Sequence, residues 1–159
     1  MTEEKTAVQR LEEEGDIAAD YLEGLLDIAD LDGDIEIGVE NERASLVIEG
    51  GGDLGHLVGR DGEVLDAIQE LTRLAVQTST GERSRLMLDI DGYRQDKKSA
   101  LAKLAEETAD EVKSSGKPIK LAPMNAFERK IVHDTIQKIG LTSESEGEDP
   151  DRCVVVMPA

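Results

Sequence analysis

The sequence predicts an α+β protein built from two small domains. Segments such as "DIEIGVE" and "SRLMLDID" alternate apolar and polar residues with the period of a strand, whereas longer segments repeat apolar residues three or four apart, as helices do. A length of 159 residues and a hydrophobic content of 38% suffice for two small cores. Both halves of the chain mix the two patterns, and no internal repeat relates them.

The first half predicts the order helix, strand, strand, turn, helix, strand. The first helix has apolar residues at helical spacing and ends at "DGD"; these residues are Ile17, Tyr21, Leu22, Leu25 and Ile28. Two alternating runs at 34–40 and 44–50 predict a β-hairpin, and a strand is expected at 84–91. The intervening helix, from Glu63 to about Thr78, carries one apolar stripe: Val64, Leu65, Ile68, Leu71, Leu74 and Ala75. We expect this domain to span residues 16–93.

The second half predicts helix, strand, helix, strand, strand. A long helix over 93–115 ends at "SSGKP", where serine, glycine and proline stop it. A short strand within "KPIKLAP" (117–123) and a helix at 123–140 follow, the helix with Phe127, Ile131, Ile136 and Ile139 on its apolar face. Two strands joined by an acidic loop complete a domain over residues 94–159, which includes the connecting helix.

The chain is strongly acidic, with a formal net charge of −18. The acid is uneven, because residues 1–32 hold 11 acidic and two basic side chains. We expect residues 1–15 to form a solvated, partly disordered acidic arm. Charge on such an arm is largely screened beyond a Debye length of about 8 Å, so it does not exclude a local site for nucleic acid.

The sequence favours a cytoplasmic protein. Its N-terminus lacks the apolar segment of a signal peptide, and its longest apolar run, "CVVVM", is far shorter than the ~20 residues of a membrane-spanning helix. The single cysteine, Cys153, cannot form an intramolecular disulfide, and within that run it is predicted to be a small buried hydrophobe rather than a reactive thiol.

Several kinds of chemistry find no support. The stretch "GGGDLG" at 50–55 matches the dinucleotide-binding pattern G-x-G-x-x-G, but Gly59 and Gly62 follow too closely for the required helix to start at Gly55. His56 and His133 are the only histidines, and neither lies in a cluster with metal-ligand spacing. One Phe and two Tyr are too few for an aromatic sheet that stacks bases. We expect no enzyme activity, cofactor or metal.

The stretch "VGRDGEVLDAI" indicates a contact with phosphate. Gly59 and Gly62 have no Cβ, so a sugar-phosphate backbone could lie directly on the loop. The following helix would direct its free N–H groups and the positive end of its dipole at that backbone, and Arg60 adds a mobile cation. The alternative is an ordinary turn between two helices, capped by glycines.

Val58, Gly59, Arg60, Asp61 and Gly62, with Leu65 and Ile68 in register, resemble the G-x-x-G signature of KH domains, which clamp about four nucleotides. The order of elements resembles the type II, bacterial KH topology, α-β-β-α-α-β. Asp61 departs from the pattern, because loops of the family are often doubly basic. Its negative charge predicts a low affinity or a displaced path of the backbone.

Arg129 and His133 in "FERKIVHD" stand four residues apart on one predicted helix face, with Lys130 beside them. This is the Arg-x-x-x-His pattern that names the R-three-H domain, a family associated with single-stranded nucleic acid. The resemblance implies a β-α-β-β sheet with helices. Arg129 would supply a planar fork for phosphate, and His133 would share that phosphate, more strongly when protonated. A merely structural helix face is the alternative.

The segments "APMNAFERKIVHDTIQ" and "TSESEGEDPDRCVVVMP" resemble the C-terminal module of the Jag-type (SpoIIIJ-associated) bacterial proteins, and the resemblance covers about residues 16–159. The resemblance does not extend to the additional N-terminal domain of many members, in whose place we expect the acidic arm. The resemblance implies a regulatory protein that binds single-stranded RNA, with a small single-KH-domain protein as partner and an indirect link to membrane-insertion and cell-division machinery. The alternative is a protein-protein adaptor at the cell envelope.

Overall fold

The structure, a computed structural model, describes residues 6–50 and 52–159 and divides into two compact units, Met1–Arg94 and Gln95–Ala159. Each unit combines helices with one three-stranded sheet. The predicted α+β class with two small domains is therefore confirmed. The expected domain boundary after residue 93 lies one residue before the division between the units.

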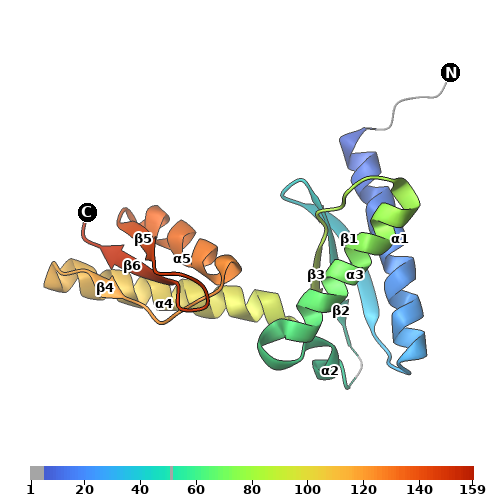
Figure 1. Cartoon of the computed structure of the whole chain (residues 1–159), viewed down its shortest axis with the longest axis horizontal. Coiled ribbons are helices and arrows are strands. Elements are labelled where there is room, and N and C mark those ends of the chain that lie inside the picture. Colours follow the sequence, from blue (N-terminus) through green and yellow to red (C-terminus); the bar gives the residue numbers. More distant parts are fainter. Residues whose placement is uncertain (1–5, 51) are drawn as a thin grey trace. The chain divides into compact units, whose positions relative to one another are not determined.

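The first unit has the predicted order α-β-β-α-α-β. Its elements are α1 (Ala7–Ile28), β1 (Asp34–Glu40), β2 (Arg43–Glu49), α2 (Gly55–Val58), α3 (Glu63–Thr80) and β3 (Met87–Ile90). The sheet order is β1-β2-β3, with β1 antiparallel and β3 parallel to β2. The helices α1 and α3 contact each other and cover one face of this sheet (Figure 1).

The core of the first unit follows from the period of two along its strands. Leu46 and Ile48 of β2 and Leu88 and Ile90 of β3 are fully buried, whereas the residues between them are partly accessible. Because successive side chains of a strand point to opposite faces, these four residues all face the two helices. Leu22 of α1 and Leu65 of α3 meet them in one cluster.

The partial disorder predicted for the acidic arm, residues 1–15, is wrong over its described part, although most of residues 6–13 are exposed as expected. The helix α1 begins at Ala7, because Thr6 and Gln9 form a capping box: the Thr6 hydroxyl accepts from the Gln9 N–H at 3.1 Å, and the Gln9 side chain accepts from the Thr6 N–H at 2.9 Å. Gly15 is buried inside this helix, where a Cβ would lie 2.5 Å from Cγ2 of Ile37. Residues 1–5 lie outside the described residues.

The apolar stripe predicted for α3 is also wrong in part. Leu65 and Ile68 are buried, but Val64, Leu71 and Leu74 are 38%, 49% and 55% exposed. Gln69 and Thr72 are buried in their place. Their polar atoms are satisfied, because Gln69 Oε1 accepts from the Leu88 N–H at 3.0 Å and Thr72 Oγ1 donates to the Ile68 carbonyl at 2.7 Å. An apolar strip of α3, made of Val64, Leu71 and Leu74, is left uncovered.

The second unit consists of most of α4 (Tyr93–Ser115), β4 (Ile119–Lys120), α5 (Ala126–Ile139), β5 (Thr142–Glu146) and β6 (Cys153–Met157). Its sheet is antiparallel with the order β4-β6-β5. The core contains Ala105 and Val112 of α4, Val132 and Ile136 of α5, and Val154 and Val156 of β6. Cys153 is buried, which confirms the expectation of a thiol sequestered from solvent.

Candidate nucleic-acid interface

The glycine loop joins α2 to α3 through a short 3-10 turn, Arg60–Gly62. Val58, Leu65 and Ile68, three of the residues predicted for this site, are buried in the core. Arg60 and Asp61 present their side chains to solvent. The loop therefore offers these two side chains and its backbone to a ligand, while the apolar residues hold it against the core.

The two glycines of the loop have an internal reason to be glycine. Both have positive φ, 73° at Gly59 and 77° at Gly62. A Cβ on Gly59 would collide with the Val64 side chain, and a Cβ on Gly62 would lie 2.6 Å from Cε1 of the Tyr93 ring. The sequence left two explanations for these glycines open, the close approach of a ligand and an ordinary glycine-capped turn between two helices. In the structure, the space that a side chain would need is filled by the protein itself.

The electrostatics of the loop are mixed. The helix α3 spans 18 residues, and its N-cap, Gly62, provides no side-chain hydrogen bond to the first turn. The Glu63 N–H already donates to the Arg60 carbonyl, so an anion beside Arg60 would be favoured mainly by the positive end of the helix dipole. Asp61 and Glu63 oppose such an anion, since both are exposed in the same turn. The arrangement suits a phosphate bound weakly through backbone and one cation.

The second predicted site lies on α5, which starts at a capping box between Asn125 and Glu128. Arg129 follows directly and is 9% exposed. Its Nη1 donates to the Met124 carbonyl at 2.5 Å and to Oδ1 of Asp149 at 3.3 Å. Lys130 is exposed and pairs with Asp134 at 3.0 Å, one turn along the helix. The guanidinium of Arg129 is therefore anchored on the protein, and Lys130 is the mobile cation.

His133 lies one turn after Arg129 and is held by the edge strand β5. Its Nδ1 is 2.5 Å from the Ser143 hydroxyl, and its Nε2 is 2.8 Å from the Ser145 hydroxyl. Burial and then the positive charge of Arg129 lower the pKa of His133; Asp134 opposes this and Arg152 adds to it. The expected protonated histidine on a phosphate is thus disfavoured in the unbound protein, where both ring nitrogens are already engaged.

Four further members of this site, Arg152, Ser143, Ser145 and Asp149, were not predicted from the sequence. Arg152 directly precedes β6, and its Nη1 donates to the Gly147 carbonyl at 2.8 Å. Its charge acts on His133, so the two arginines and the histidine form one electrostatic group. In the sequence, these residues were marked only by an arginine and alternating serines on either side of an acidic loop. The pairing of the strands decides which of these side chains meet α5, and the sequence pattern does not show that pairing.

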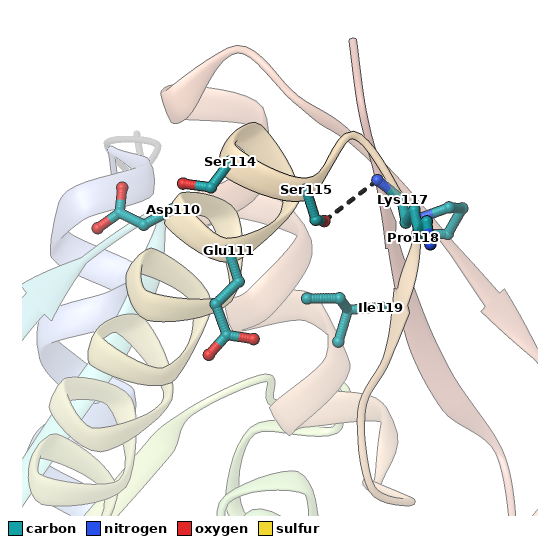
Figure 2. Close-up of a pocket in the computed structure, with 7 residues that line it drawn as sticks. All are labelled: Asp110, Glu111, Ser114, Ser115, Lys117, Pro118 and Ile119. Atoms are coloured by element: carbon teal, nitrogen blue, oxygen red, sulfur yellow. Dashed lines mark hydrogen bonds between the residues drawn. The ribbon is translucent and has the colours of Figure 1, made fainter.

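Other features of the described residues do not extend these sites. An open hollow of about 600 Å³ lies between the end of α4 and β4, lined by Asp110, Glu111, Lys117 and Ile119 among others, and it contains none of the predicted site residues (Figure 2). Within residues 6–50 and 52–159, no group of His, Cys, Asp or Glu side chains is arranged to hold a metal ion. Nor does any described helix combine the length and apolarity needed to cross a bilayer.

Comparisons with known proteins agree with the geometry of the second unit. Residues 99–158 match the model of the R-three-H domain. The chain is 35% identical over 143 residues to the RNA-binding protein KhpB of Clostridium symbiosum, covering 89% of this chain and 64% of that protein.

It is also 34% identical to the RNA-binding protein KhpB of Lactiplantibacillus plantarum, over 86% of this chain and 42% of that protein. Sperm-associated antigen 7 of Mus musculus is 34% identical over 60% of this chain. The chain thus spans between 42% and 64% of the length of the two KhpB relatives. The family match and the fold of the second unit together identify residues 99–158 as an R-three-H domain.

Proposed function

We propose that this chain is a regulatory protein of the Jag type that binds single-stranded RNA in the cytoplasm and is not an enzyme. The first unit would act as a type II KH domain and the second as an R-three-H domain. The observation that carries the proposal is the glycine loop: it stands at the N-terminus of α3, which has no side-chain cap, exposes Arg60, and belongs to a unit with the α-β-β-α-α-β order. The printed name of the KhpB relatives supports RNA as the ligand.

A single strand suits the loop better than a duplex. The loop is one short turn, which can follow one sugar-phosphate backbone. The chain has 36 acidic and 18 basic side chains, which leaves little positive surface to span the two backbones of a duplex. Binding should therefore be modest and sensitive to salt, with a slope of about −0.7 per phosphate contact in a plot of log K against log salt.

The test is a titration of a fluorescent oligoribonucleotide, single-stranded or in a duplex, at two salt concentrations. We expect tighter binding to the single strand and weaker binding at high salt. Arg60→Gln should weaken the binding severalfold. The matched control, Arg83→Gln, removes the same charge from an exposed position after α3 and should bind as the unchanged chain does. Equal binding to the duplex, or equal effects of the two substitutions, would contradict the proposal.

A protein partner belongs to the same proposal. The apolar strip of α3 exposes Val64, Leu71 and Leu74 on one helix face, and exposed apolar side chains gathered on one face are typical of interfaces. We propose that this strip contacts a small single-KH-domain protein, through which the chain is linked indirectly to the membrane-insertion and cell-division machinery. The strip begins beside the RNA loop, since Val64 packs against Gly59, and it continues along α3 to Leu71 and Leu74.

A further inference from the structure

Asp149 and Arg129 form an ion pair in which the two partners are very differently exposed. The Asp149 side chain is 73% exposed, whereas that of Arg129 is 11% exposed. Asp149 lies in the β5–β6 loop, residues 147–152, between the two strands of a hairpin. An exposed carboxylate can leave such a pair at little cost, because water solvates it at once. The buried arginine stays in place.

Arg129 keeps donors for a second anion. Its described hydrogen bonds use Nη1 alone, to Met124 and to Asp149. Its Nε and Nη2 donate to no atom that the structure describes. Every buried side-chain nitrogen or oxygen among the described residues has a hydrogen-bond partner, so these two nitrogens are not buried. These donors therefore reach solvent. A guanidinium binds carboxylate and phosphate with the same planar fork, so the two anions are alternative partners for it.

The loop that carries Asp149 is held close to the arginines. The Arg152 Nη1 donates to the Gly147 carbonyl at 2.8 Å, and the Asp151 N–H donates to the Glu148 carbonyl at 2.8 Å. With Glu148, Asp149 and Asp151, the loop places three carboxylates within four residues. It is thus a concentrated negative charge fixed next to the cations of the second site.

We propose that Asp149 is an intramolecular competitor for phosphate at Arg129, so that the β5–β6 loop sets the affinity of the R-three-H domain for RNA. In the unbound chain the carboxylate occupies Nη1 of Arg129 and repels an anion that approaches the neighbouring donors. Binding of a phosphodiester then requires Asp149 to move into solvent. This inference rests on the proposed function, since it names the residue that tunes the second RNA site.

The test compares Asp149→Asn with Glu148→Gln in the full chain. Both remove one negative charge from the same loop, but the Glu148 carboxylate pairs with no residue that the structure describes. Affinity for a single-stranded oligoribonucleotide is measured at constant salt, and circular dichroism checks that each variant is folded. Asp149→Asn should tighten binding about two- to fivefold, the range that an exposed ion pair provides, whereas Glu148→Gln should change it by less than about 1.5-fold.

Each outcome decides the proposal. If both variants tighten binding equally, the loop acts by its overall charge and Asp149 is no specific competitor. If Asp149→Asn weakens binding, the carboxylate instead orients Arg129 for RNA, and the proposal is wrong. If the unchanged chain binds RNA but neither variant differs from it, this inference alone fails. If neither the chain nor its variants bind RNA, the proposed function fails and the competition fails with it.

Discussion

The ring of Tyr93, the first residue of α4, lies over Gly62, where a Cβ would come within 2.6 Å of the ring. This contact joins the glycine loop to the residues that follow β3. Arg94 strengthens the same junction, since its Nε donates to the Leu88 carbonyl at 2.6 Å and its Nη2 to Asp66 at 3.0 Å. The shape of the loop is therefore fixed by the fold of the first unit, independently of any ligand.

Gly62→Ala should destabilise the first unit. Alanine at φ 77° is strained, and its methyl group would displace Tyr93. The matched control is Gly81→Ala, because Gly81 has φ 80° but open space around its Cβ position. We expect the control to cost about 1 kcal/mol and Gly62→Ala about 1–3 kcal/mol more, measured by urea unfolding. Equal losses would show that Tyr93 yields without cost. If Gly62→Ala costs more than the control, as predicted, loss of RNA binding in this variant is no evidence for an RNA contact at Gly62.

Asp61→Asn should tighten RNA binding. Asp61 is exposed and has φ 54°, a conformation that asparagine tolerates well, so the change removes a charge and preserves the turn. The gain should be about two- to fivefold, because an exposed charge pair contributes about 0.2–1 kcal/mol. Asp30→Asn is the control, since Asp30 is also exposed and has φ 55°. A gain of the same size in the control would place the effect in the net charge of the chain, away from this loop.

His133 should make the stability of the R-three-H domain depend on pH. Its pKa is lowered in the folded chain, mainly by burial, whereas in the unfolded chain it has its ordinary value of about 6.5. Below that value the unfolded state binds the proton first, so stability is highest above it and falls as the pH drops towards the lowered pKa.

The melting temperature of the unchanged chain should thus fall more between about pH 7.5 and about pH 5.5 than that of His133→Gln. Carboxylates also titrate at the acidic end, but they are the same in both proteins, so the difference between the two melting curves isolates the histidine. A parallel fall in both would mean that His133 is protonated equally in the folded and unfolded chains.

Leu71→Glu tests whether the apolar strip of α3 is the interface with the protein partner. Leu71 is 49% exposed, so the change should alter the free energy of unfolding by less than about 0.5 kcal/mol. Binding to a single-KH-domain protein of the same organism, measured by calorimetry, should weaken by about tenfold or more if the strip is the centre of the interface. Leu104→Glu, at a 37% exposed position on α4, is the control. Unchanged affinity in Leu71→Glu would exclude the strip as the contact.

The sequence predicted the order of elements because the periods of the strands and helices are local properties. Ile35 and Ile37 of β1, or Leu101 and Ala105 of α4, reveal their element within one or two turns of chain. The N-terminal helix was predicted to start too late because acidic residues outweighed the capping-box pattern of Thr6 and Gln9, which was present in the sequence.

The parts that could not be predicted depend on contacts between distant residues. Gln69 is buried because the Leu88 N–H reaches it from β3, and no pattern within α3 indicates this. Likewise, Asp149 meets Arg129 from 20 residues away, and the two serines meet His133 only through the position of β5. Arg129 and His133 were found from their spacing. Their hydrogen-bond partners, which decide what the pair can bind, required the fold.

The central claim is that single-stranded RNA contacts the loop between α2 and α3, and amide NMR of the full 17.2 kDa chain tests it most directly. In a titration with a single-stranded oligoribonucleotide, the N–H signals of Gly59, Arg60, Asp61, Gly62 and Glu63 should shift together and saturate, and added salt should reverse the shifts. The same signals should move much less with a duplex of equal length. Shifts confined to residues outside this loop, or none at an oligonucleotide concentration that saturates the chain in the fluorescence titration, would contradict the account.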